Sequence, residues 1–90
     1  MPLFAVICRD KPDHLSVRLD TRAAHLEFLG GRDVVRMAGP LLEDGEMRGS
    51  LIVLETDSLK DAQAWAAEDP YQAAGLFDSV EVIEWKKVIG

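Results

Sequence analysis

The sequence predicts a ferredoxin-like α+β fold, in which two helices cover one face of a four-stranded antiparallel sheet. Segments with strand and helix patterns follow one another in the order strand, helix, strand, strand, helix, strand. The chain has 90 residues, which is enough for a single domain over residues 1–90. The strands are apolar on both faces, although the helices can cover only one. We therefore expect two copies to pair sheet against sheet as a homodimer, a dimeric α/β barrel.

The first strand and the longer helix are expected in the first third of the chain. Residues 3–8 are a continuous apolar run of strand length, closed by the polar residues 9–13. A helix is expected over residues 13–29, because Gly30 and Gly31 follow its last periodic position. Cys8 lies in the apolar strand and is interpreted as a small buried hydrophobic residue.

A hairpin is expected in the middle of the chain. Residues 34–38 and 49–56 have strand patterns, and the connection over residues 39–47 carries turn signals at Gly39-Pro40 and Asp44-Gly45. Ser58, with Asp61 three positions later, has the pattern of a capping box that starts a second helix. This helix is expected to run to about Glu68, before Pro70. Residues 71–78 are then expected to form a loop and residues 79–88 the fourth strand.

Composition and charge exclude several classes of function. Ten Lys and Arg against sixteen Asp and Glu leave a net charge of -6, which would repel nucleic acid and anionic membrane surfaces. No apolar run approaches the ~18 residues of a membrane span and the first residues lack a basic signal region, so we expect a cytoplasmic protein. A single cysteine allows neither an intramolecular disulfide nor a cysteine-rich zinc site. We expect no metal and no cofactor, and we assign Met37, Met47, Trp65 and Trp85 to packing.

The first helix carries a polar stripe where its buried face is expected. On a helical wheel, His14, Arg18, Arg22 and His25 share a sector of roughly 80° between two apolar arcs. Burying such groups without partners costs several kcal/mol, so something must compensate them. Arg18 and His14 fit equally well at the rim of the helix contact, with the arginine extended to solvent. For His25 and Arg22 we favour a polar pocket between helix and sheet, neutralised by an anionic ligand.

Asp69 and Ser50 are two further candidate residues. In Glu68-Asp69-Pro70-Tyr71, the proline keeps Asp69 out of helical conformation and turns the chain back over the sheet. The alternative for Asp69 is a solvated turn residue. Ser50 opens an apolar strand and can point its hydroxyl into the cavity, but a nucleophilic serine needs a base within hydrogen-bond reach.

Several short motifs occur in a fixed order along nearly the whole chain. They are Cys8-Arg9-Asp10-Lys11-Pro12, Arg18, Arg22-Ala23-Ala24-His25-Leu26, Gly39-Pro40-Leu41, Gly49-Ser50, Asp69-Pro70-Tyr71 and Ala74-Gly75-Leu76. In their order and spacing these motifs resemble the YciI-like (YCII-related) proteins. The resemblance implies a dimeric α+β barrel, related in fold to muconolactone isomerase and to small cofactor-free monooxygenases.

The resemblance also implies a site. The family's proposed His and Asp pair falls on His25 and Asp69, and its serine after glycine falls on Ser50. A similar protein acts as a dehydrochlorinase on a chlorinated hydroxyhydroquinone. Fold analogy alone does not choose among reactions.

Two classes of function follow. In an enzyme, His25 would be the general acid and base, and Asp69 would fix its tautomer and raise its basicity. Arg22, with Arg18 in reserve, would bind a carboxylate or phenolate of a small, cyclic anion. The other residues of the substrate-binding set are Ser50, Tyr71, Gly39 and Pro40.

Isomerisation of a lactone and elimination of hydrogen halide both suit proton transfer without a cofactor. The alternative class is a binding module that holds a small metabolite or docks on another protein without chemistry. Oxygenation of a quinol without a cofactor is a third hypothesis.

Overall fold

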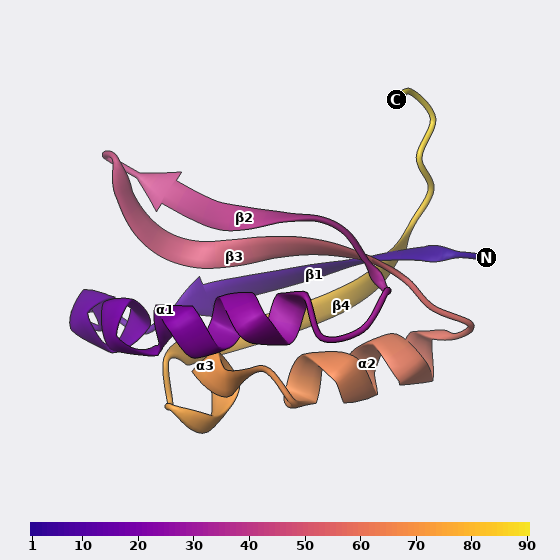
Figure 1. The fold of residues 1–90 in the computed structure, drawn as a ribbon. Coiled ribbons are helices and arrows are strands. Elements are labelled where there is room, and N and C mark those ends of the chain that lie inside the picture. The colour runs from indigo at the N-terminus through magenta and orange to yellow at the C-terminus, as the bar shows by residue number, and fades with distance from the viewer.

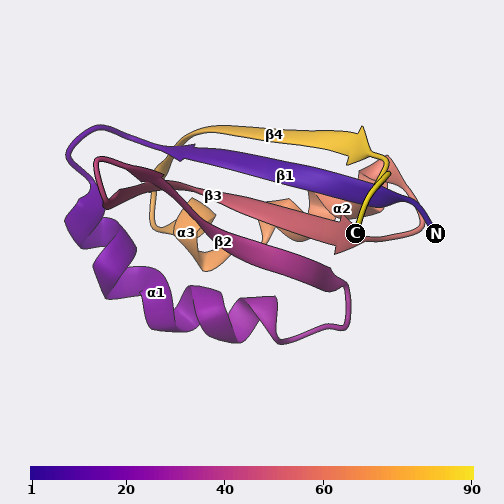
Figure 2. The same ribbon diagram turned by 90° about the horizontal axis from the view of Figure 1, so that it is seen from above.

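The computed structural model describes residues 1–90 and places all helices on one side of a single sheet (Figure 1). The four strands are antiparallel and lie in the order β2-β3-β1-β4 (Figure 2). This arrangement confirms the predicted ferredoxin-like fold. The elements are β1 (Leu3–Asp10), α1 (Leu15–Leu29), β2 (Val35–Glu43), β3 (Glu46–Glu55), α2 (Leu59–Ala67), α3 (Pro70–Ala73) and β4 (Phe77–Trp85).

The apolar core lies between the central strands and the helices. Alternate residues of a strand point to opposite faces, so Phe4, Val6 and Cys8 of β1 face the helices together. The ring of Trp65 on α2 stacks on Phe28 of α1 with 4.6 Å between ring centroids, which joins the two helices over the sheet. The core consists of Phe4, Val6, Cys8, Ile52, Leu54, Ala62, Trp65 and Ala66.

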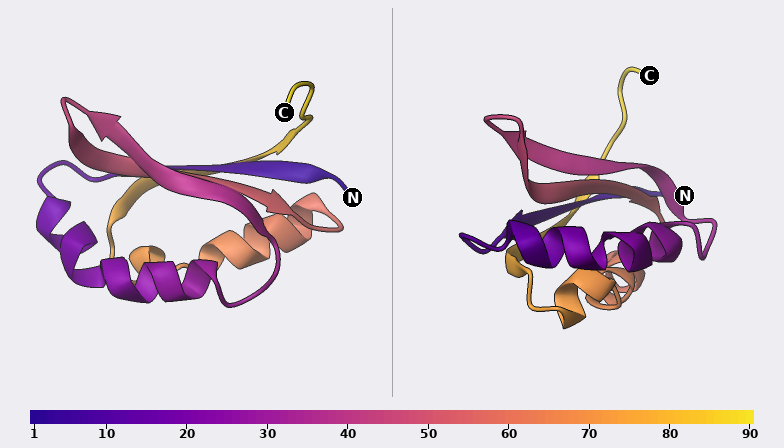
Figure 3. Two further views of the ribbon diagram at one scale, coloured as in Figure 1. Left: turned by 45° about the horizontal axis from the view of Figure 1, so that its top comes forward. Right: turned by 60° about the vertical axis from the view of Figure 1, so that its left-hand side comes forward.

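The hairpin between β2 and β3 is tighter than the sequence predicts. Its turn contains only Asp44 and Gly45, whose φ angles of 51° and 79° are typical of a two-residue hairpin turn. The prediction of a turn at Gly39-Pro40 is wrong, because β2 continues through both residues to Glu43. β2 is an edge strand, and an edge tolerates the missing N–H of a proline. The hairpin curls away from the helices (Figure 3).

The segment after α2 is more ordered than the predicted loop. The short helix α3 occupies part of it, and β4 begins at Phe77 and ends at Trp85, earlier than predicted at both ends. The cap of α2 is confirmed, since Ser58 Oγ accepts a hydrogen bond from the Asp61 N–H at 3.1 Å. α1 begins at Leu15 rather than at residue 13. None of the helices combines the length and apolar composition needed to span a membrane.

The sheet face that points away from the helices is uncovered. The strand register places Ile83 beside Ala5 and Trp85 beside Leu3 on this face. Ile83 is 50% exposed and Met37 56% exposed. Trp85 is also exposed, so Met37 and Trp85 do not pack in the core of a single chain as predicted. The residues after β4 project on the same side of the sheet (Figure 1).

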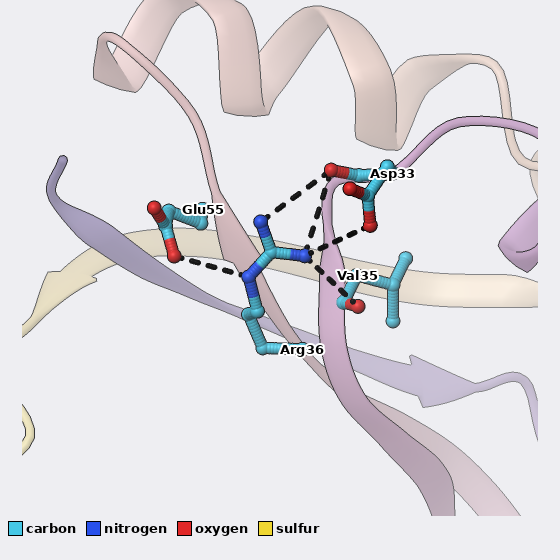
Figure 4. A network of polar contacts seen from close by, with 4 residues as sticks. All are labelled: Asp33, Val35, Arg36 and Glu55. Carbon is cyan, nitrogen blue, oxygen red and sulfur yellow. Dashed lines mark hydrogen bonds and ion pairs between the residues drawn. The ribbon is translucent and has the colours of Figure 1, made fainter.

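A surface ion-pair network holds the start of β2. Arg36 donates from Nε to Glu55 at 3.0 Å and from Nη1 to Asp33 at 3.4 Å (Figure 4). Arg36 lies where the pairing of β2 with β3 shifts by one residue. The Arg36 and Glu55 side chains are about one-third exposed and Asp33 is fully exposed, in contrast with the ionisable groups buried under α1.

Candidate active site

Helix α1 buries ionisable rather than apolar side chains. Its buried residues are Arg18 and His25, and its leucines and phenylalanine are only half-buried or exposed. The two buried positions are seven residues apart, which puts them on the same helix face about 10.5 Å apart along the axis. The polar stripe predicted from the sequence therefore does contact the interior, at these two positions.

Arg18 is compensated by a carboxylate of the protein. Its Nε and Nη2 donate to the two oxygens of Asp10 at 2.7 and 2.8 Å, and Nη2 also donates to Ser50 Oγ at 3.0 Å. The Arg18 and Asp10 side chains are 2% and 3% exposed. Burial alone would lower the pKa of Arg18, but the hydrogen bonds and charge of Asp10 outweigh burial and raise that pKa. Arg18 is thus a buried, permanently charged group, not a rim residue.

His25 is held by Asp69. Its Nδ1 lies 2.9 Å from Asp69 Oδ1 and 3.1 Å from Oδ2, and both side chains are buried. An ionised carboxylate can only accept, so this geometry favours the tautomer in which Nδ1 carries the proton and Nε2 is free. The local sequence explains the position of Asp69. Pro70 is the first residue of α3, and Asp69 caps this helix by accepting from the Tyr71 N–H at 3.0 Å.

Tyr71 links the two buried groups of α1. Its ring stacks on the His25 imidazole with 4.0 Å between centroids and 20° between planes. Arg18 Cζ lies 4.6 Å from the centre of the same ring. Burial raises the pKa of the Tyr71 hydroxyl, and the charge of Arg18 opposes that effect. Since Arg18 and His25 are two helical turns apart, the tyrosine ring fills the space between them.

Three polar atoms of this cluster make no hydrogen bond of normal length and angle within the chain. They are Nε2 of His25, Oη of Tyr71 and Nη1 of Arg18. Every fully buried side-chain nitrogen or oxygen in the protein has a partner, so these three atoms keep a small contact with solvent, although Tyr71 is only 1% and Arg18 2% exposed. The cluster therefore presents one imidazole nitrogen, one phenol and one guanidinium edge to a ligand.

Cys8 and Ser50 border the cluster but lack the features of nucleophiles. Burial, reinforced by the charge of Asp69, raises the pKa of the Cys8 thiol to about 12, which leaves it protonated at neutral pH. Ser50 Oγ accepts from Arg18 and makes no hydrogen bond to a histidine or carboxylate. Ser50 thus helps to hold the guanidinium.

The structure separates some predicted site residues from this cluster. The sequence predicts that Arg22 lies in a polar pocket between helix and sheet, but it is exposed. Its charge is still close enough to lower the pKa of Tyr71. Gly39 and Pro40 are exposed on the edge strand β2, where Pro40 pairs with Ser50 of β3. His14 Nδ1 lies 2.8 Å from the carbonyl oxygen of Pro12, in the turn before α1.

Asp10 is the one residue of the cluster to which the sequence analysis assigns no role, although it lies within the motif Cys8-Arg9-Asp10-Lys11-Pro12. Its signal is the alternation along β1, which directs Phe4, Val6 and Cys8 inward and continues to Asp10. No group of three or more His, Cys, Asp or Glu side chains is placed to hold a metal ion. A surface hollow of about 390 Å³ lies at the other end of the sheet beside Thr56 and Trp65.

Comparisons with known proteins agree with this architecture. The YCII-related domain family matches residues 2–86. Protein YciI of Escherichia coli is 38% identical over 99 aligned positions, covering 96% of this chain and 98% of that protein. A protein of Haemophilus influenzae is 32% identical, covering 94% of this chain and 97% of its own length.

A solved structure that is similar in both sequence and fold comes from a bacterial enzyme. It is the 5-chloro-2-hydroxyhydroquinone dehydrochlorinase TftG from Burkholderia phenoliruptrix, in complex with 2,5-dihydroxybenzoquinone. The TM-score is 0.87 at 34% identity, and the match covers 93% of each chain.

Proposed function

The chain belongs to the YCII-related family, and we propose that it is an enzyme that transfers protons on a small, cyclic, anionic substrate without a cofactor. The observation that carries this proposal is the buried contact of His25 Nδ1 with both oxygens of Asp69 at 2.9 and 3.1 Å. It orients the imidazole and leaves Nε2 at the surface as the proton acceptor. Positioned proton transfer of this kind typically contributes about 10²- to 10⁴-fold in rate.

Asp69 supports the proton transfer in two ways. Its carboxylate accepts the Nδ1 proton, which fixes the tautomer whose Nε2 lone pair is available. When Nε2 takes a proton from the substrate, the imidazolium that forms lies against a buried negative charge. The same imidazolium then returns the proton at another atom of the substrate or to water.

Elimination of hydrogen halide fits these residues well. The ring carbon that bears the halogen first takes up a proton, while an ionised ring oxygen becomes a carbonyl. The base then removes a proton from a ring hydroxyl, the electrons of that O–H bond form a second carbonyl with a shift of a ring double bond, and the halide leaves with the electrons of its own bond. No oxidant or reductant is needed, so an acid/base residue and an anion site suffice. The dehydrochlorinase that is similar to this chain supports this class, and isomerisation of a cyclic lactone needs the same residues.

The uncovered sheet face supports a homodimer. Ile83 and Trp85 of β4 and Met37 of β2 present exposed apolar side chains on one face of the sheet. Contiguous apolar surface of this kind marks an interaction site, and a second copy offers the same surface in return. We include this dimer in the proposal, with the helices and the His25 site on the outer faces of the two sheets.

The two histidines allow a controlled test of the proposal. The parent protein, His25→Gln and His14→Gln are incubated with 5-chloro-2-hydroxyhydroquinone, and free chloride is measured against the reaction without protein. We expect chloride release by the parent and by His14→Gln, and a loss of at least about 100-fold in His25→Gln. Equal release by the parent and His25→Gln would contradict the proposal. Saturable binding without chloride release would favour a non-catalytic binding module for this ligand.

A further inference from the structure

The guanidinium of Arg18 is engaged on one side only. Asp10 takes Nε and Nη2 in a paired, side-on contact, and Ser50 takes a second proton of Nη2. A planar guanidinium that is hydrogen-bonded through two of its nitrogens cannot turn, so the direction of its third nitrogen is fixed. Nη1 is that third nitrogen, and it makes no hydrogen bond of normal length and angle within the chain.

The same contact sets the position of Tyr71. The Arg18 guanidinium lies against the tyrosine ring, with 4.6 Å between Cζ and the ring centre, and the ring stacks on His25. The guanidinium and the imidazole therefore both contact the Tyr71 ring, which gathers Nη1, the Tyr71 hydroxyl and Nε2 into one cluster. Two donors in one cluster suit an oxygen that carries negative charge, and a partly buried site strengthens such hydrogen bonds.

We propose that Asp10 is a positioning residue, which orients Arg18 so that Nη1 and the Tyr71 hydroxyl form a binding subsite for an oxyanion beside His25. This inference rests on the proposed function and deepens it by naming the ligand class. The ligand is a planar ring with an ionised oxygen, as in a hydroxyquinone or a phenolate. Arg22 lies outside this arrangement because it is exposed and has no carboxylate partner.

Matched lysine substitutions separate fixed geometry from charge. Arg18→Lys and Arg22→Lys both keep one positive charge on α1, but only Arg18→Lys removes a fork held by Asp10. Binding of 2,5-dihydroxybenzoquinone, whose hydroxyls are acidic, is measured by calorimetry at pH 7. Hydroquinone is the neutral control, because simple phenols ionise near pH 10.

We expect Arg18→Lys to weaken binding of the dihydroxyquinone about tenfold to hundredfold, since a charge-assisted pair is lost. Hydroquinone binding changes less than about threefold, and Arg22→Lys changes neither ligand by more than about threefold. Asp10→Asn weakens the anion about as much as Arg18→Lys, and the double variant is no weaker than either alone. If Asp10→Asn does not fold, Asp10→Glu keeps the charge, changes its reach and is expected to weaken the anion selectively.

Several results would overturn the positioning role. Tighter binding of the anion by Asp10→Asn would show that Asp10 acts only as a repelling charge. An equal loss of affinity for the dihydroxyquinone and for hydroquinone would show that the Asp10–Arg18 pair only supports the fold. If the parent binds the dihydroxyquinone and no variant of Asp10 or Arg18 matters, the positioning role is wrong and the proposed function stands. If the parent binds neither ligand, the proposed substrate class fails together with the subsite.

Discussion

The two faces of the sheet differ in which side chains they bury: the helix-covered face buries ionisable groups, and the uncovered face exposes apolar ones. Under α1, Arg18, His25, Asp10 and Asp69 are buried, and each has a charged or hydrogen-bonded partner from another element. On the uncovered face, apolar side chains such as Ile83 are half exposed. Burial of ions is costly unless they are paired, and exposure of a contiguous apolar face is unusual unless a partner covers it. These two departures from ordinary packing support the two proposals, a ligand site under α1 and a second copy on the uncovered face.

Removing one buried partner should have the largest effect. Arg18→Ala leaves Asp10 buried without its cation, and we expect a loss of about 3–5 kcal/mol in the free energy of unfolding, measured by urea denaturation. The matched control is Arg36→Ala, whose ion pairs with Glu55 and Asp33 are exposed (Figure 4). We expect its urea midpoint to stay near that of the parent. Equal losses in the two variants would mean that burial does not distinguish the two networks.

Alkaline pH should weaken the helix side through Cys8. The pKa of its thiol is about 12 in the folded protein against an ordinary value of 9.0, so the folded state holds the extra proton between these values. Stability is then unaffected by Cys8 below pH 9 and falls as pH rises from 9 to 12, by about 4 kcal/mol. Urea titrations across this range measure the loss. Cys8→Ala should reduce the fall of the free energy of unfolding between pH 9 and 12. An unchanged fall would contradict a raised pKa of the Cys8 thiol.

A charge on the uncovered face should break the proposed dimer. Ile83→Lys is expected to raise the dimer dissociation constant about thirtyfold or more, since the ammonium would be buried between two apolar sheets. Leu19→Lys is the control, because Leu19 is equally exposed but lies on α1. Sedimentation equilibrium distinguishes the two. A monomeric parent, or a dimer lost equally in both variants, would exclude pairing through the sheet.

The smallest expected effect belongs to a polar contact at the edge of the fold. Ser58 caps α2 through the Asp61 N–H, and both residues are outside the buried cluster. Ser58→Ala is expected to cost about 1 kcal/mol in the free energy of unfolding. Thermal unfolding measures this change, and a cost as large as that of Arg18→Ala would show that capping, not the buried pair, dominates.

The periodicity of apolar residues in the sequence predicts the order of the helices and strands, but it does not predict where each one begins and ends. It does not reveal the short helix α3, because four residues after Asp69 are too few to show a period. Gly39-Pro40 imitates a turn because that dipeptide usually signals one, and only the sheet order shows that β2 is an edge that tolerates proline.

The candidate site is predictable in part for related reasons. The wheel places Arg18, Arg22 and His25 in one sector, but it cannot tell which side chain finds a carboxylate below it. The carboxylate below the helix is Asp10, and it pairs with Arg18. Asp10 does not stand out in the sequence, because it is the last residue of β1 and polar residues surround it. The contact of His25 with Asp69 spans 44 residues of sequence, so only the family resemblance points to it.

The state of the His25 ring tests the central claim most directly. Nitrogen-15 NMR of the imidazoles reports which ring nitrogen carries the proton in the neutral form, with His14 as the internal reference. We expect a proton on Nδ1 and a bare Nε2 in the parent, and a loss of this preference in Asp69→Asn while His14 is unchanged. A parent protein with the proton on Nε2, or a His25 signal that ignores the substitution of Asp69, would contradict a role for this pair in proton transfer.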